Sequence, residues 1–286
     1  MSTPTPPPVP PTPPPSGGPR PEAASPGGPL PAAAVPPPRP PVPTEATATG
    51  SRSPWRVIAL VLVAVLAVGA GLALLNVAFR RTRVETAVYQ QPVSRVVVET
   101  STGSIEVRRG DAGSPISLRR TLEWSFGSAS SQEAVSGDVL TIRARCAETV
   151  GFGRCSVSYI LSVPEATAVN LTSSTGSLQV RDLSGDVQAR ASTGSVELTG
   201  LRSSTATAET STGSVLVSFA ASPTSVSARA STGSVDIVLP QDGTEYDVRA
   251  STSTGHQSIT VPVRTKSPRH IIASTSTGSV AVRTAG

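Results

Sequence analysis

The chain has 286 residues, 24 Lys and Arg against 19 Asp and Glu, and only 3% aromatic residues. Its net charge of +5 is a mild excess that no stripe of basic residues with interleaved aromatics accompanies. Nucleic-acid binding is therefore not expected, because it needs a concentrated basic surface. A zinc site is not expected, because zinc normally takes four ligands and neither His256 nor His270 is near Cys146 and Cys155 in sequence.

Residues 1–53 hold most of the prolines, in runs such as Pro6 to Pro8 and Pro36 to Pro38, and contain no aromatic residue. Such a segment cannot bury enough apolar surface to offset the conformational entropy lost on folding. We expect a disordered, proline-rich tail with polyproline II character. Its role is either that of a spacer or that of a docking strip for a polyproline-binding domain.

Residues 55–79 are expected to form one transmembrane α-helix. Val57 to Leu75 is an uncharged run of 19 residues. A helix of that length spans about 28 Å, close to the ~30 Å hydrocarbon core of a bilayer. Trp55 suits the membrane interface at one end. A cleaved signal peptide is the alternative, but the run starts too late and is too long for one.

Cys146 and Cys155 flank a Gly-containing segment between two strand-like stretches, Val139–Arg145 and Ser156–Val163. We predict a hairpin with a disulfide at the base of its loop. Disulfides persist in oxidising compartments. Residues 84–286 are therefore expected outside the membrane and the tail in the cytoplasm, although the arginines on both sides of the helix give no clear orientation.

The tetrapeptide Ser-Thr-Gly-Ser, or a near copy, occurs seven times. Its glycines are Gly103, Gly176, Gly194, Gly213, Gly233, Gly255 and Gly278. The last six are separated by 18, 19, 20, 22 and 23 residues, whereas a catalytic motif normally occurs once. The motif therefore indicates a structural repeat. The glycines are predicted to form turns, because glycine adopts positive φ without strain.

Apolar and polar residues alternate on both sides of each motif, as in Asp186 to Leu198, which marks two short strands. Two strands and two turns fit one coil of a β-solenoid, whose successive coils would stack about 4.8 Å apart. Small inward residues, such as Ala189, Ala191, Ala228 and Ala230, predict a thin interior. A sandwich of antiparallel hairpins is the alternative.

We thus predict an all-β outer domain, a β-helix-like stack of Ser-Thr-Gly repeats at 173–286 preceded by an N-terminal β region at 84–172. The stretch 104–172 lacks the motif and has more large residues, so we expect it to cover the N-terminal end of the stack. Four of its residues either belong to this cap or form a binding patch: Arg119, Arg120, Glu123 and Trp124.

Catalytic chemistry is not expected. Asp247, Ser253 and His256 are a conceivable triad, but strand geometry should point them to different faces. The sequence has no nucleotide-binding loop, haem motif or metal cluster. We expect no catalytic residue, no metal and no cofactor, and hence no enzyme.

The runs from Val163 to Val180 and from Leu183 to Val196 resemble the bacterial "putative adhesin" family. Its members carry repeated β-strands and a domain of unknown function, and they are related to the toastrack β-domains of envelope-associated proteins. The resemblance extends over about residues 96–283. It implies a surface-exposed, non-enzymatic β-repeat domain and carries over no binding residue. The proline-rich tail is not part of the family pattern.

We therefore predict a single-pass protein of the bacterial cytoplasmic membrane whose outer domain is an adhesin or an envelope interaction module. Its expected partner is a cell-wall polymer, another surface protein or a neighbouring copy. The alternative is a transmembrane signalling protein with an outer β sensor domain and a cytoplasmic docking tail. A hydrolase is disfavoured because convergent catalytic groups are missing.

Overall fold

The computed structural model describes residues 54–125, 127–148 and 154–286. The tail expected at residues 1–53 lies outside the described residues. After one α-helix, the described chain forms the strands β1 to β19. The predicted all-β class of the domain that follows the helix is confirmed.

The helix α1 (Pro54–Ala78) begins with a proline, whose fixed φ and missing N–H suit the first helical turn. Its segment Val57–Leu74 has a mean hydropathy of 2.9. Large aliphatic side chains such as Leu60 and Leu66 are exposed, so the described chain does not cover them. By length and composition the helix can cross a membrane.

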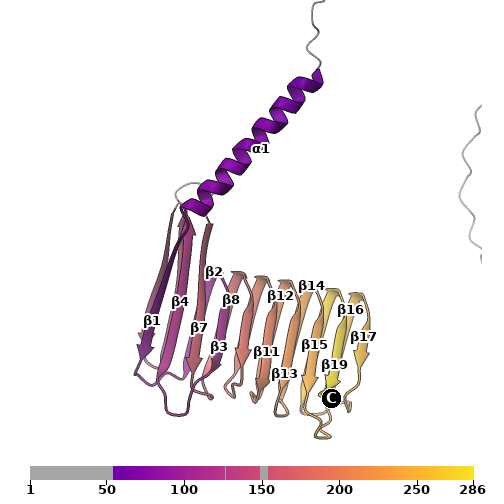
Figure 1. The fold of residues 1–286 in the computed structure, drawn as a ribbon. Helices are drawn as coiled ribbons and strands as arrows, with labels where there is room; N and C mark the ends of the chain where they lie inside the picture. The colour runs from indigo at the N-terminus through magenta and orange to yellow at the C-terminus, as the bar shows by residue number, and fades with distance from the viewer. Residues whose placement is uncertain (1–53, 126, 149–153) are drawn as a thin grey trace, which may run out of the picture. The chain divides into compact units, whose positions relative to one another are not determined.

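The strands form two sheets that face each other across one hydrophobic core (Figure 1). The strands of sheet A are, in spatial order, β1 (Arg81–Tyr89), β4 (Ile116–Ser125), β7 (Arg154–Val163), β3 (Ile105–Arg109), β9 (Leu178–Arg181), β11 (Val196–Leu201), β13 (Val215–Phe219), β15 (Val235–Leu239), β19 (Val280–Thr284) and β17 (Gln257–Ile259). The strands of sheet B are β16 (Asp247–Thr254), β18 (His270–Thr277), β14 (Ser225–Thr232), β12 (Thr205–Thr212), β10 (Val187–Thr193), β8 (Ala168–Thr175), β2 (Arg95–Thr102), β6 (Val139–Glu148) and β5 (Gly127–Ser136).

Seven coils carry the Ser-Thr-Gly corner, and each contributes one strand to each sheet. Neighbouring coils pair in parallel and in step, so that Thr193 lies opposite Thr212. At Gly194 the φ angle is +137°, and a Cβ atom would lie 2.1 Å from the carbonyl oxygen of Gly176 in the preceding coil. A side chain would therefore separate the backbones, and only glycine allows the ~4.8 Å strand spacing at this corner.

The coils do not stack strictly in sequence order. The last coil, β18–β19, lies between β14–β15 and β16–β17. The corner glycines follow this order, because Gly278 approaches Gly233 and Gly255 approaches Gly278. The expectation that successive coils are neighbours is therefore wrong here. Since the corner sequences are nearly identical, they favour stacking but do not specify which coil is the neighbour.

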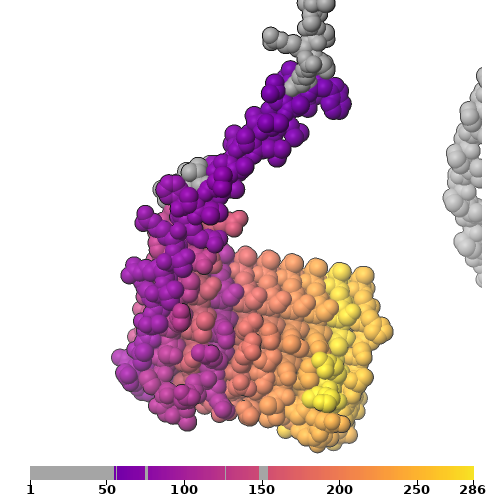
Figure 2. Space-filling view, in the orientation of Figure 1, coloured from indigo at the N-terminus to yellow at the C-terminus, as the bar shows by residue number. Residues whose placement is uncertain are grey.

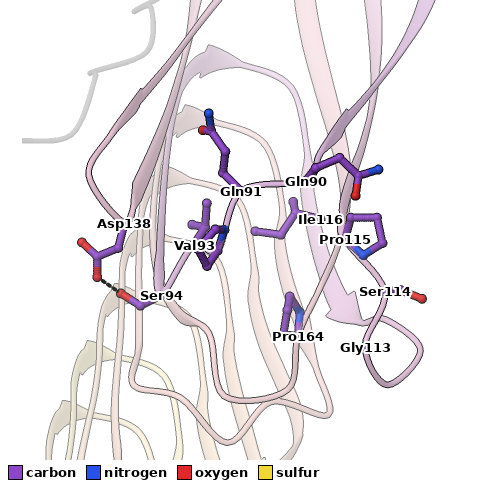
Figure 3. A pocket seen from close by; sticks show the side chains of 11 residues that line it. Gln90, Gln91, Val93, Ser94, Gly113, Ser114, Pro115, Ile116, Asp138 and Pro164 are labelled. Carbon is purple, nitrogen blue, oxygen red and sulfur yellow. Dashed lines mark hydrogen bonds between the residues drawn. The ribbon is translucent and has the colours of Figure 1, made fainter.

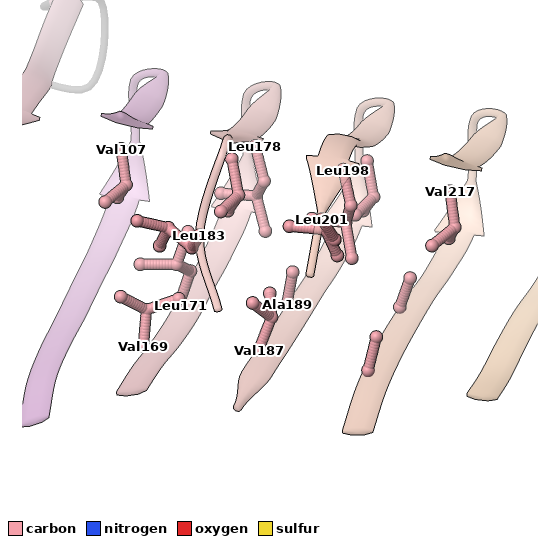
Figure 4. Packing of buried hydrophobic residues seen from close by; sticks show 14 of the residues in the cluster. Val107, Val169, Leu171, Leu178, Leu183, Val187, Ala189, Leu198, Leu201 and Val217 are labelled. Carbon is pink, nitrogen blue, oxygen red and sulfur yellow. The ribbon is translucent and has the colours of Figure 1, made fainter. Parts of the chain in front are cut away.

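The interior is narrow because sheet B contributes a row of small side chains. Ala189, Ala208, Ala228 and Ala273 lie in register on neighbouring strands, and all four are buried. Sheet A supplies larger side chains, such as Leu198, from the facing side (Figure 4). Aliphatic packing along the stack and the backbone ladder thus take the place of the aromatic core that the composition lacks.

The N-terminal end of the stack is closed by strands without the motif. In sheet A, β4 pairs antiparallel with β1 and β7, and in sheet B β5 pairs antiparallel with β6. Between the sheets, Arg120 of β4 forms ion pairs with Glu85 of β1 and Glu133 of β5. Tyr89 donates a hydrogen bond to Glu133. One guanidinium group thereby joins the edge strands of both sheets.

Cys146 and Cys155 are bonded, with their sulfur atoms 2.01 Å apart. Cys146 lies on β6 in sheet B, and Cys155 lies on β7 in sheet A. The predicted hairpin is therefore wrong, because β6 pairs with β5 and β2 while β7 pairs with β4 and β3. The bridge joins the two sheets. A hairpin loop and a coil corner both connect two stretches of alternating residues, so the pattern does not distinguish them.

Candidate interaction surface

A row of threonines runs along one edge of sheet B, where each coil turns at its glycine. The threonines lie in register from coil to coil, in the spatial order Thr102, Thr175, Thr193, Thr212, Thr232, Thr277 and Thr254. Thr102 is partly exposed and the other six are exposed, as are the serines that precede all seven. The row presents hydroxyl donors and acceptors at the ~4.8 Å spacing of paired strands.

A row of charges crosses the outer face of sheet B beside these threonines. Glu209 of β12 lies in register between Arg190 of β10 and Arg229 of β14. Its carboxylate accepts from Arg190 at 2.9 Å and forms an ion pair with Arg229 at 3.4 Å. In the same row, Arg143 and Glu99 are paired at 2.9 Å. Exposed pairs of this kind add only about 0–1 kcal/mol of stability, but they hold opposite charges in a fixed order.

The row of charges borders a shallow groove of about 520 Å³ that extends over several coils. Its lining includes Thr172, Arg190, Glu209, Arg229 and Ser274, together with the serines that precede three of the corner threonines, Ser192, Ser211 and Ser231. Figure 2 shows the solenoid surface as regular rows of residues that cross successive coils. An open, regular groove suits an extended partner better than an enclosed small molecule.

The row of charges was not predicted from the sequence, although the sequence holds a signal for it. Glu99, Arg190, Glu209 and Arg229 each stand four residues before a corner glycine. Aligning the repeats on their glycines would place these residues in one column. Because coils pair in step, such a column becomes a row on the outer face of the sheet.

A separate pocket of about 480 Å³ lies where β1 ends and β2 and β4 begin (Figure 3). Ser94 donates a hydrogen bond to Asp138 at its side, which lowers the pKa of the Asp138 carboxyl. Among the residues that line the pocket there is one carboxylate and no basic side chain, so they form no acid–base pair. They are Gln90, Gln91, Pro92, Val93, Ser94, Gly113, Ser114, Pro115, Ile116, Asp138 and Pro164.

The four residues assigned by sequence to a cap or a patch do not form one surface. Arg120 pairs with carboxylates between the sheets, and Trp124 packs against the core. Arg119 and Glu123 occupy the alternate positions of β4, and Arg119 is exposed. The pleat of one strand therefore separates the two pairs, because successive side chains point to opposite faces.

The conceivable triad is not assembled. Asp247 lies opposite His270, with its Oδ2 atom 3.6 Å from Nδ1 of that histidine. Ser253 is six residues along the same strand, about 20 Å from Asp247 at the usual rise per residue. His256 is exposed at the corner that follows. Among the described residues, no group of three His, Cys, Asp or Glu side chains could hold a metal ion.

Comparison with solved structures finds chains of adhesin-like description. A "putative cell adhesion protein" from Clostridium sporogenes is 7% identical with a TM-score of 0.41, covering 72% of this chain and 100% of its own. A "putative adhesin" from Bacteroides fragilis is 10% identical with a TM-score of 0.32, covering 71% of this chain and 97% of its own. A "putative lipid binding protein" from Parabacteroides distasonis is 12% identical with a TM-score of 0.27, covering 71% of this chain and 97% of its own.

A search among curated proteins finds no match to the chain. The family model of Toastrack DUF4097 matches residues 64–285, which include all nineteen strands described above. The relation to toastrack domains inferred from the repeats is confirmed. The chain belongs to the Toastrack DUF4097 family.

Proposed function

We propose that the chain is a single-pass protein of the bacterial cytoplasmic membrane whose solenoid is a non-enzymatic adhesin or envelope interaction module. In this proposal α1 is the membrane anchor, residues 84–286 are extracytoplasmic, and the outer face of sheet B is the contact surface. The observation that carries it is the groove along that face, in which hydroxyls and paired charges repeat from coil to coil. A repeating surface matches a partner that itself repeats, such as a cell-wall polymer.

Binding to cell-wall material tests the contact surface. The double variant Arg190→Gln, Arg229→Gln removes both arginines of the groove and leaves the backbone unchanged. The matched control is Arg108→Gln, Arg181→Gln, which removes two neighbouring arginines from the outer face of sheet A. Full-length protein in detergent is sedimented with purified cell-wall sacculi. We expect the sheet B variant to sediment several-fold less than wild type and the sheet A variant to sediment like wild type.

Equal sedimentation of all three proteins would refute the role of the sheet B groove, provided that their melting temperatures agree. All four exchanged arginines are exposed, so both double variants should fold normally. A loss that is the same in both variants would indicate nonspecific electrostatic binding instead.

Labelling of intact cells tests the anchor and its orientation. An impermeant maleimide should label Cys146 and Cys155 only after treatment with a reductant, because these two cysteines form a disulfide. Membranes washed with alkaline carbonate should retain the protein. Release by carbonate would contradict the anchor, and labelling that requires cell lysis would contradict the orientation.

A further inference from the structure

The two sheets end in four edge strands, and three of them are protected against pairing with another strand. On β1 and β5, Glu85 and Glu133 lie between the sheets, where Arg120 binds both. Inward charges of this kind oppose the addition of a further strand. The edge strand β17 is only three residues long, and Pro262 follows it closely.

The fourth edge, β16, has none of these protections. It is eight residues long, contains no proline, and its inward positions are Val248, Ala250 and Thr252. On one side it pairs with β18 along its whole length. On the other side, within the described chain, the single bridge lies just before the strand, between Tyr246 and Val263.

Backbone hydrogen bonds show where this bridge ends. Tyr246 donates its N–H to Pro262 and accepts the N–H of Arg264. The chain then turns away near Lys266, whose φ is +66°. No described strand continues along Val248 to Thr252 on this side, so their outward N–H and C=O groups are available to a further strand.

We propose that this edge binds the β16 strand of a second copy of the chain, antiparallel and related by a two-fold axis normal to the sheets. This interface goes beyond the proposed function and does not depend on the ligand of the sheet B groove. Such a pairing uses the same edge of both copies and leaves only protected edges outside. The assembly therefore closes as a dimer and does not extend into a fibre.

The side chains of β16 favour one register. With Ser251 on the axis, Arg249 lies opposite Ser253 of the second copy, and Ala250 lies opposite Thr252 of the second copy. A register with Arg249 on the axis would bring the Arg249 side chains of the two copies close together. The register with Ser251 on the axis keeps these charges apart and leaves the Tyr246 bridge intact. Val263, which is 53% exposed, would then lie against the glycine corner of the second copy. The dimer would thereby cover an apolar side chain at this end of the stack.

Cysteine cross-linking tests this register. Ser251 is exposed, and in a non-hydrogen-bonded antiparallel pair the two Cα atoms would be about 4.5 Å apart, within the range of a disulfide. The variant Ser251→Cys in full-length protein, solubilised in detergent and mildly oxidised, should form a covalent dimer that a reductant dissociates. The native cysteines do not interfere, since the described chain has no free cysteine.

The matched control is Ser274→Cys, because Ser274 lies beside Ser251 on β18 but one strand away from the edge. Its two copies would be about 14 Å apart across the axis, too far for a disulfide. We expect the Ser251 variant to cross-link several-fold more than this control. Equal cross-linking would mean random collision, and a monomeric Ser251→Cys protein whose thiol reacts with maleimide would also overturn the proposal. Cross-linking of that cysteine in membranes to a different protein alone would overturn the choice of partner.

Discussion

At the N-terminal end of the stack, side chains between the two sheets hold the edge strands. At the C-terminal end, hydrogen bonds between the loops that connect the coils hold the terminal coils in place. Arg120 joins β1 to β5 at the first end, and the Cys146–Cys155 bridge joins β6 to β7. At the other end, Arg269 donates to the carbonyl oxygens of Ser222 and Pro223, both at 2.7 Å.

The loops at the C-terminal end form a polar network of their own. Ser222 donates to Asp242 at 2.5 Å, and the hydroxyl of Tyr246 donates to Ser222 at 2.9 Å. This network fixes the start of β16 but does not reach along its edge. One end of the stack therefore closes its sheet edges, and the other fixes only the start of its terminal coil β16–β17.

The largest difference between the ends should appear at the corner glycines. At Gly103 a Cβ atom would lie 2.1 Å from the carbonyl oxygen of Val157, and at Gly255 it would lie 1.9 Å from that of Gly278. The coil of Gly103 has neighbours on both sides, but the coil of Gly255 has one and can move away. We expect Gly103→Val to cost more than about 4 kcal/mol, and Gly255→Val to release only the terminal coil.

Circular dichroism melting and amide hydrogen exchange measure these two effects. The Gly103 variant should lose its cooperative transition, while the Gly255 variant should keep it and lose protection in residues 246–259. Equal melting temperatures for the two variants would show that the coil β16–β17 is as firmly held as the inner ones.

The ion cluster of the N-terminal end gives the next effect. Arg120→Ala would remove the cation that Glu85 and Glu133 share between the sheets and leave Glu133 with hydroxyl partners alone, at a cost of about 2–4 kcal/mol. Arg119→Ala is the control on the same strand, where an exposed side chain should cost less than about 0.5 kcal/mol. The free energy of unfolding in urea distinguishes them. Similar values for both variants would mean that the cluster does not close this end.

Removal of the disulfide should have a somewhat smaller effect. The bridge spans a sequence separation of 9 residues, and its loss in Cys146→Ser, Cys155→Ser should cost about 2–3 kcal/mol through the added freedom of the unfolded chain. Hydrogen exchange should increase in β6 and β7 and stay unchanged in β16 and β18. An equal increase at both ends would contradict the local role of the bridge.

Lowering the pH should reduce the stability of both ends of the stack, and this is the smallest of the expected effects. The hydrogen bond from Arg120 holds the pKa of Glu85 below its ordinary 4.5, and hydrogen bonds from Ser222 and Thr244 lower the pKa of Asp242 to about 2. A lowered folded pKa contributes stability above the unfolded pKa, and that stability is lost as the pH falls through the folded pKa.

For Asp242 the loss falls between about pH 4 and about pH 2, and for Glu85 it begins below its ordinary pKa. Glu85→Gln and Asp242→Asn should each flatten part of the acid dependence of the urea midpoint. Amide hydrogen exchange at low pH then shows at which end of the stack each variant changes the stability. An unchanged acid profile in both variants would show that neither carboxylate is linked to folding.

The repeating part of the fold could be predicted from the sequence because the corner imposes a local demand. Glycine is needed where a Cβ atom would meet the neighbouring coil, as at Gly194, and alternation fixes which side chains face inward, as at Ala189. These constraints act within a few residues and are therefore visible in each repeat.

The order of the coils and the closure of the ends could not be predicted in this way. They depend on contacts between distant residues, such as Arg120 with Glu133 or Gly255 with Gly278. Near-identical corners can stack in more than one order, so sequence proximity is a poor guide to which coils meet. The hairpin assigned to Cys146 and Cys155 failed for the same reason, because local alternation does not tell which sheet a strand joins.

The position of β18–β19 inside the stack has a consequence for the order of events during synthesis. Residues 246–259 leave the ribosome before residues 270–284, yet they rest on them in the finished molecule. The coil β16–β17 therefore stays without its neighbour until residues 270–284 have been translated. The earlier coils β8 to β15 can form while the chain grows, but completion of this one waits for β18 and β19.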